Sequence, residues 1–147
     1  MNTHDAVLKA INEKIGKREA EFLSPPPVFL TMKGEFISFD ADAGILRARF
    51  PVLGEYLNPY GSMQGGMIAA AVDNTIGPLS FLVAAPNVTR RLEMKYTQPV
   101  TPDRAYIIVE ARLLEQKERQ LFFSAAVREI AGQILARAKA LHWILDE

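Results

Sequence analysis

The chain has 147 residues, 49% of them hydrophobic and 23% charged, which is enough for one domain with a sizeable buried core. Its 17 basic and 17 acidic residues cancel, so the composition does not favour a nucleic-acid or anionic-membrane partner. There is no cysteine, and His4 and His142 lie at opposite ends of the chain, so neither disulfides nor a metal site are expected. The mixed-charge N-terminal region does not resemble a signal peptide, and no spanning segment is apparent, so we expect a cytoplasmic protein without a membrane anchor.

Residues 1–27 are expected to form a helix and a proline-rich connector ahead of the main domain. Apolar side chains at near-helical spacing predict a surface helix over residues 5–22, capped by one of the polar residues near its start. The run Ser24-Pro25-Pro26-Pro27 is then expected to end that helix and form a stiff extended connector. Residues 28–147 are expected to form a single domain.

The first half of this domain combines a β-hairpin pattern with a strongly apolar segment. Residues 35–40 and 44–50 each have the pattern of a strand, with a short turn between them. A loop rich in glycine, asparagine and proline follows from Pro51 to Gln64. The chain is then apolar on all sides from about Gly65 to Gly77, which predicts a buried helix that Pro78 ends or kinks.

The second half has a period of two, which is typical of antiparallel strands. Four strands joined as a meander are expected over residues 88–98, 105–114, 121–129 and 133–144. One helix that is apolar all round needs a sheet to cover it. The elements therefore predict an α+β fold in which a curved antiparallel sheet of about six strands wraps around one central helix.

Asp73 is the most unusual residue of the apolar helix. It follows the run Met67-Ile68-Ala69-Ala70-Ala71-Val72, where a carboxylate is expected to be buried and therefore to need partners or to perform chemistry. Just upstream, Gly65 and Gly66 expose backbone N–H groups at a helix N-terminus, which attracts negative charge. A carboxylic acid and an anion-stabilising helix N-terminus within one segment indicate a hydrolytic site.

The segment Asn58-Pro-Tyr-Gly-Ser-Met-Gln-Gly-Gly-Met-Ile-Ala-Ala-Ala-Val-Asp73 resembles the signature of hotdog-fold acyl-CoA thioesterases, in the phenylacetate-pathway-like branch. Its asparagine, glycines and aspartate fall in the register of that signature, and the strand from Thr89 to Pro99 resembles the family's Thr/Ser-led strand. The resemblance covers about residues 33–144. It departs at Gln64, where most of the branch has His, so a side chain that can titrate is replaced by one that only forms hydrogen bonds.

The resemblance implies thioester hydrolysis without a metal or cofactor. Asp73 would activate water as a general base, or less readily act as a nucleophile, and the amides of Gly65 or Gly66 would stabilise the oxyanion. Gln64 would add an amide donor or hold the loop. Thr89 would orient the attacking water or the carboxylate.

The resemblance also suggests residues that bind the acyl-CoA substrate. Asn58 would hold the loop or the thioester group through its amide. Met63 and Met67 are candidates for an acyl pocket, although core packing is the preferred interpretation of such residues. Arg90 and Arg91 are candidates for contacts with the phosphates of coenzyme A, although exposed strand charges usually face solvent.

Asp73 lies eight residues beyond Gly65, about 12 Å along one helix axis, which is too far for both to act on one thioester within a chain. The resemblance implies a homodimer, often paired further into a tetramer, in which Asp73 of one protomer faces the Asn58–Gly66 loop of the other. The distance supports a dimer independently, though weakly.

Two other functions stay open at this stage. A non-catalytic acyl-CoA binding or sensing protein is favoured by Gln64 in place of His. A dehydratase acting on hydroxyacyl thioesters needs a His paired with an acid, and neither His4 nor His142 is expected near the motif. The sequence does not determine the acyl group, nor whether the thiol belongs to coenzyme A or an acyl carrier protein.

Overall fold

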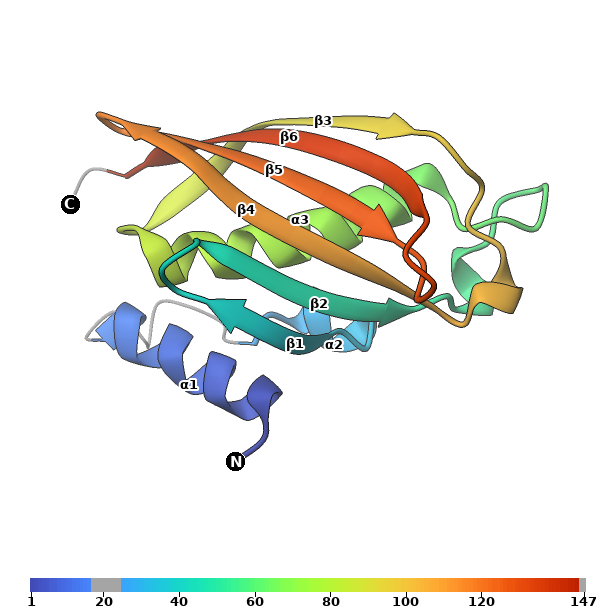
Figure 1. The fold of residues 1–147 in the computed structure, drawn as a ribbon, viewed down its shortest axis with the longest axis horizontal. Coiled ribbons are helices and arrows are strands. Elements are labelled where there is room, and N and C mark those ends of the chain that lie inside the picture. The colour runs from blue at the N-terminus through green and yellow to red at the C-terminus, as the bar shows by residue number, and fades with distance from the viewer. Residues whose placement is uncertain (17–24, 146–147) are drawn as a thin grey trace.

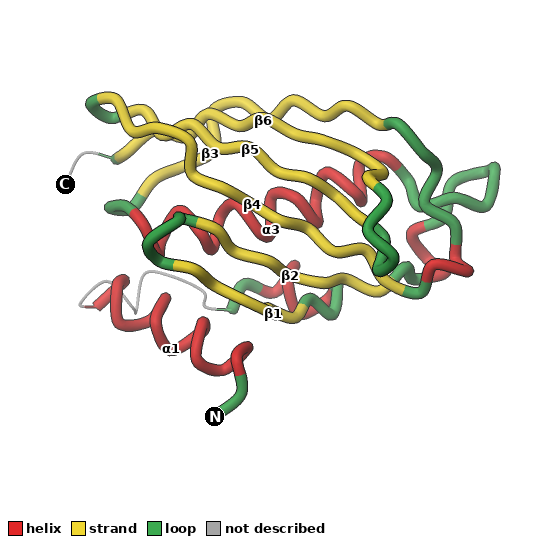
Figure 2. Tube along the Cα trace, viewed as in Figure 1, coloured by secondary structure: helices red, strands yellow, loops and turns green. Residues whose placement is uncertain are grey.

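The computed structural model describes residues 1–16 and 25–145, which form one six-stranded antiparallel sheet curved around a long helix, with a second helix outside (Figures 1 and 2). The expected α+β architecture with a central and an N-terminal helix is confirmed. The elements in chain order are α1 (Thr3–Ile15), α2 (Pro27–Thr31), β1 (Glu35–Asp40), β2 (Ile45–Pro51), η2 (Gly54–Tyr56), α3 (Gly65–Val83), β3 (Asn87–Tyr96), η3 (Pro102–Arg104), β4 (Tyr106–Lys117), β5 (Gln120–Arg128) and β6 (Ile134–Ile144).

The strands lie in the order β1-β2-β4-β5-β6-β3, so the expected four-stranded meander is wrong for β3. Strands β4, β5 and β6 form a meander, but β3 pairs with β6 at the far edge of the sheet rather than with β4 (Figure 1). A period of two fixes which side chains share a face of a strand, but it carries no information about the neighbouring strand.

The inward face of the sheet and one side of α3 form the core. Helix α3 packs against β2, β3, β4 and β5. Removing a large aliphatic or aromatic side chain from water stabilises the fold by about 1.5–3 kcal/mol, before the entropy of ordering that side chain is counted. The fully buried core residues include Leu46, Ala48, Phe50, Val72, Ile76, Leu79, Ile107, Val109, Ala111, Leu121 and Val127.

Helix α3 continues through Pro78 to Val83, so the expectation that it ends near Gly77 is wrong. A proline inside a helix costs about 3 kcal/mol, because one backbone hydrogen bond is lost and the ring crowds the preceding turn. Two buried leucines beyond it, Leu79 and Leu82, offset that cost by packing into the core. By length and composition α3 would also pass as a membrane-spanning helix, a test that core helices of soluble proteins pass too.

Helix α1 is shorter than the predicted helix over residues 5–22. It begins after Asn2, whose Oδ1 accepts a hydrogen bond from the Asp5 amide at 2.8 Å, and it ends at Gly16, where φ is +57°. The predicted helical residues beyond Gly16 lie outside the described part of the chain. Helix α1 buries an apolar face against β1 and α3.

The proline-rich connector is not extended at its C-terminal end. Pro27 begins the short helix α2, which the sequence analysis did not predict, and Ser24 lies outside the described residues. Proline is compatible with the first helical position, because its missing N–H has no partner there in any helix. The domain boundary after residue 27 stays a prediction.

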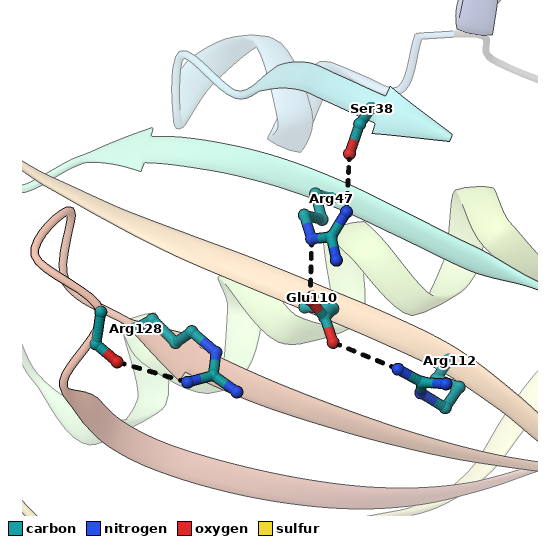
Figure 3. A network of polar contacts seen from close by, with 6 residues as sticks. Ser38, Arg47, Glu110, Arg112 and Arg128 are labelled. Carbon is teal, nitrogen blue, oxygen red and sulfur yellow. Dashed lines mark hydrogen bonds and ion pairs between the residues drawn. The ribbon is translucent and has the colours of Figure 1, made fainter. Parts of the chain in front are cut away.

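Glu110 lies at the centre of a polar network on the outer face of the sheet (Figure 3). Its carboxylate accepts a hydrogen bond from Arg47 Nε at 2.7 Å, and Arg112 Nη2 lies 3.6 Å away. Arg47 also donates to Ser38 Oγ at 3.3 Å. Partial burial raises the pKa of Glu110, but the hydrogen bond and charge of Arg47, with the charges of Arg112 and Arg128, hold it below its usual value. The network therefore favours an ionised Glu110.

Candidate active site

The loop before α3 is held in shape by Asn58. The Asn58 amide donates to Ser62 O at 2.7 Å, and its side-chain Oδ1 accepts from the Tyr60 and Ser62 amides at 2.9 and 3.1 Å. Leu57 and Met63 form an isolated β-bridge across the base of this loop. The Asn58 oxygen is therefore occupied by its own loop, which leaves the side-chain N–H₂ as the group able to meet a ligand.

Helix α3 begins at this loop with two glycines. Gln64 precedes the first turn, and its carbonyl accepts from the amides of Met67 and Ile68 at 2.9 and 3.1 Å. Its side chain is exposed and makes no capping hydrogen bond, so it is open to solvent. The backbone N–H groups of Gly65 and Gly66 form no hydrogen bond with any described residue. The helix end thus presents free amide donors, as the sequence predicts.

Tyr96, at the end of β3, fixes the position of Gly65. Its hydroxyl donates to Gly65 O at 2.6 Å, and partial burial raises the pKa of Tyr96. A Cβ placed on Gly65 would lie only 3.2 Å from the tyrosine ring, so this close approach favours glycine.

Asp73 is exposed, so the expectation of a buried carboxylate is wrong for this chain. Thr89 Oγ1, on β3, donates to Asp73 Oδ1 at 3.2 Å. Across residues 1–16 and 25–145, no basic side chain forms an ion pair with this carboxylate. Asp73 is therefore an accessible acid oriented by one hydroxyl.

His142 lies directly behind Thr89, contrary to the expectation that neither histidine is near the motif. The two residues are opposite each other in the β3–β6 pairing, and His142 Nε2 is 3.3 Å from Thr89 Oγ1. His142 Nδ1 is 2.7 Å from Oδ1 of Asn87, and the imidazole is 2% exposed. Burial lowers the pKa of His142, and the charge of Asp73 opposes that shift. Its nearness to Asp73 depends on β3 lying beside β6, which no local pattern indicates.

An apolar cavity of about 180 Å³ opens beside Asp73. It lies between α1, the segment that leads into α2, β1 and α3, and Asp73 and Gly77 contribute to its wall. No sequence pattern predicts this cavity, because it forms only where α1 packs onto α3. The apolar side chains around it are those of Leu8, Ile11, Ile15, Phe29, Phe36 and Phe81.

The predicted substrate-binding residues lie elsewhere. Met63 is buried near the loop, where its amide donates to Val100 O at 2.7 Å, and Met67 is half-buried against the core. Neither lines the cavity beside Asp73. Arg90 lies over the ring of Trp143, with its guanidinium carbon 5.5 Å from the ring centroid, and Arg91 is exposed.

The two ends of the predicted site are separate within this chain. Helix α3 runs without a break from Gly65 past Asp73, so the eight intervening residues place them about 12 Å apart along the axis. One end offers amide donors and the other a carboxylate. Among the described residues, no cluster of three or more His, Asp or Glu side chains is suited to holding a metal ion.

No family model and no curated protein matches this sequence, but solved structures resemble its fold closely. A proposed thioesterase and phenylacetic acid degradation-related protein from Ralstonia eutropha JMP134 is 24% identical, over 92% of this chain and 98% of that one, with a TM-score of 0.78. The PaaI protein of the Escherichia coli phenylacetic acid degradation operon is 12% identical, over 98% and 97%, with a TM-score of 0.76.

A third structure, smu.793 from Streptococcus mutans UA159 bound to acetyl CoA, is 19% identical, over 78% of this chain and 90% of that one, with a TM-score of 0.71. At these identities the likeness concerns the fold. It agrees with the architecture expected from the Asn58–Asp73 segment. The chain has the hotdog fold of these structures.

Proposed function

We propose that this protein is an acyl-CoA thioesterase in which Asp73 activates the attacking water. The observation that carries the proposal is the setting of Asp73, an accessible carboxylate in the wall of an apolar cavity, hydrogen-bonded by Thr89. A thioester bound with its acyl group in that cavity has its carbonyl carbon near the cavity mouth. A carboxylate there is placed to take a proton from water.

In the proposed reaction, the water oxygen attacks the thioester carbonyl while Asp73 accepts the water proton. Thr89 occupies one carboxylate oxygen, which leaves the other free to face the water. The negative charge that develops on the carbonyl oxygen is stabilised by the free amides of Gly65 and Gly66 and by the Gln64 side chain. The carbon–sulfur bond then breaks, and the leaving thiolate takes up the proton that Asp73 accepted, which returns the carboxylate to its ionised form.

The proposed site is assembled between two protomers of a homodimer, because one chain holds its acid and its amide donors about 12 Å apart. The outer edge of β3 has no strand beside it among the described residues, and Val88 and Tyr96 on this strand are 41% and 47% exposed. An open sheet edge with exposed apolar side chains is suited to pairing with a second chain. Pairing of dimers into a tetramer stays a prediction.

The coenzyme A portion is proposed to lie over β3, where Arg90 and Arg91 are exposed and can meet phosphates. The place of Met63 and Met67 in an acyl pocket stays a prediction, as does the cytoplasmic location. The 180 Å³ cavity limits what can be enclosed beside Asp73. A methylene group occupies roughly 25–30 Å³ at interior packing density, so the cavity favours short and medium acyl groups over long ones.

The two alternatives fare differently against the same geometry. A dehydratase needs a histidine that touches its substrate, and the only histidine near Asp73 in the described chain is 2% exposed. That burial disfavours direct proton transfer between His142 and a substrate. A non-catalytic acyl-CoA binding protein is still supported by Gln64, which cannot titrate.

The deciding experiment measures thiol release from acyl-CoA thioesters of two to twelve acyl carbons, roughly spanning the capacity of the cavity and beyond it. The protein has no cysteine, so a thiol reagent detects only product. We expect Asp73→Asn to lower kcat about 100-fold or more while leaving the fold intact. Asp42→Asn, at an exposed carboxylate in the β1–β2 turn, is the matched control and is expected to keep full activity. Tight acyl-CoA binding without thiol release in either protein would establish the binding alternative.

A further inference from the structure

Four polar side chains form a continuous line from the open surface into the core beside Asp73. Asp73 Oδ1 is 3.2 Å from Thr89 Oγ1, Thr89 Oγ1 is 3.3 Å from His142 Nε2, and His142 Nδ1 is 2.7 Å from Asn87 Oδ1. The inner pair is buried, with His142 2% and Asn87 7% exposed. The mechanism above uses only Asp73 and Thr89, so the inner pair has no role in it.

Asn87 determines which nitrogen of His142 carries the hydrogen. The Asn87 side-chain N–H₂ donates to Ala85 O at 2.9 Å, which turns its oxygen toward the imidazole. An amide oxygen only accepts, so His142 Nδ1 must donate to it. In the neutral imidazole, Nε2 then has a lone pair that faces the Thr89 hydroxyl.

The Thr89 hydroxyl therefore has one hydrogen for two acceptors. When Asp73 is ionised, the hydrogen is drawn to the carboxylate, because hydrogen bonds to charged acceptors are stronger. When Asp73 has taken a proton, its oxygen becomes a weaker acceptor, and the same hydrogen can turn to His142 Nε2. The line of side chains thus offers a favourable hydrogen bond in both protonation states of Asp73.

We propose that His142, held by Asn87, is a positioning residue that acts on Asp73 through the Thr89 hydroxyl. The second acceptor keeps the Thr89 hydroxyl hydrogen-bonded before and after Asp73 takes a proton, so the hydroxyl stays in place beside the carboxylate. Asp73 and His142 are thus coupled through one hydroxyl. For catalysis this inference rests on the proposed thioesterase function, but the coupling itself does not depend on turnover.

The groups that face His142 come from three elements. Strand β3 presents Asn87 and Thr89, and β5 presents Leu121, its partner in the strand pairing, and Phe123, whose ring centroid lies 5.0 Å away. Helix α3 contributes Asp73, the charged group that acts on the imidazole among the described residues. The titration of His142 should therefore report on Asp73 and Thr89.

The test follows the imidazole nitrogens by nitrogen-15 NMR, which is simplified because the chain has only two histidines. His4 is an internal reference, because its Nδ1 accepts from the Phe36 amide at 3.1 Å and its neutral form must carry the hydrogen on Nε2. The two histidines are thus expected in opposite tautomers. His4→Gln assigns the signals.

We expect Thr89→Val and Asp73→Asn to shift the His142 Nε2 signal at neutral pH and to lower its titration midpoint by on the order of 0.5–1 pH unit. Thr89→Ser keeps the hydroxyl and is expected to stay close to wild type, and His4 should not respond in any variant. All these changes are at exposed positions, so folding is expected to be preserved. A His142 hydrogen on Nε2, or His142 signals that are unchanged in both Thr89→Val and Asp73→Asn, would overturn the inference.

Thiol release separates this inference from the proposed function. With an active enzyme, Thr89→Val is expected to lower kcat about 10- to 100-fold, and Thr89→Ser is expected to restore it. If the His142 signals respond but no thioester is hydrolysed, the coupling stands and the thioesterase proposal fails. If hydrolysis depends on Asp73 but the His142 signals do not respond, the thioesterase stands and the positioning role fails.

Discussion

Glu110, on the outer face of β4, is held between Arg47 and Arg112, whereas Asp73, on α3, forms no ion pair with any described residue. The charge of Glu110 is balanced within the chain, and its network is complete without a ligand. Asp73 is bound by one hydroxyl and lies beside an apolar cavity. A carboxylate that the fold leaves uncompensated is the better candidate for chemistry, because its second oxygen is free to act.

The sharpest test of this contrast asks whether the amide donors that act with Asp73 belong to a second chain. Gly65→Pro removes one amide donor while keeping a residue compatible with the first helical position, since Gln64 already has extended ψ at 138°. We expect at least a 100-fold loss of kcat, because an oxyanion donor is deleted. Gly65→Ala keeps the N–H, carries the same Cβ against Tyr96, and is expected to lose much less.

Mixing Gly65→Pro with Asp73→Asn should then restore activity. Random exchange between two inactive homodimers gives about half heterodimers, each with one intact composite site, so roughly a quarter of wild-type activity is expected. Thiol release after subunit exchange measures it. If the mixture stays inactive although heterodimers form, each site is contained in one chain, and Asp73 needs another explanation for its open setting.

A smaller effect is expected from filling the cavity beside Asp73. A Cβ added at Gly77 meets no heavy atom within 4 Å, and Gly77 lines the cavity, so we expect the side chain in Gly77→Leu to extend into it. We expect kcat/KM for medium-chain thioesters to fall about 10- to 100-fold, with acetyl-CoA hydrolysis nearly unchanged. Gly77→Ala is the control for the backbone effect of losing glycine. An equal loss for all chain lengths would show that the acyl group lies elsewhere.

The smallest effect is expected at Glu110. Glu110→Gln should lower the free energy of unfolding by at most about 1 kcal/mol at neutral pH and leave thiol release unchanged. Because the folded-state pKa of Glu110 is lowered, its contribution is present above the ordinary value of 4.5 and is lost as the pH falls through the folded-state pKa. Urea unfolding of both proteins at pH 7 and pH 3 measures this. Glu115→Gln, on the same strand, is the control, and a loss of thiol release in Glu110→Gln would contradict the structural role.

Much of the fold could be predicted from the chain alone. Alternation of apolar and polar side chains located all six strands to within a few residues, because each strand has one face toward the core. The unbroken apolar run located α3, and the Asn58–Asp73 segment identified the fold through its resemblance. The register of that segment also predicted Asp73 and Gly65 as active-site residues.

Three features were decided only in three dimensions. The pairing of β3 with β6 brings Thr89 and His142 together, although 53 residues separate them in the chain. The packing of α1 on α3 creates the cavity, and Asp73 stays exposed in its wall. Local sequence fixes the conformation and the faces of each element, because those depend on neighbouring residues. Which faces meet depends on the free energy of packing the whole chain, and that brings together residues whose separation no local pattern encodes.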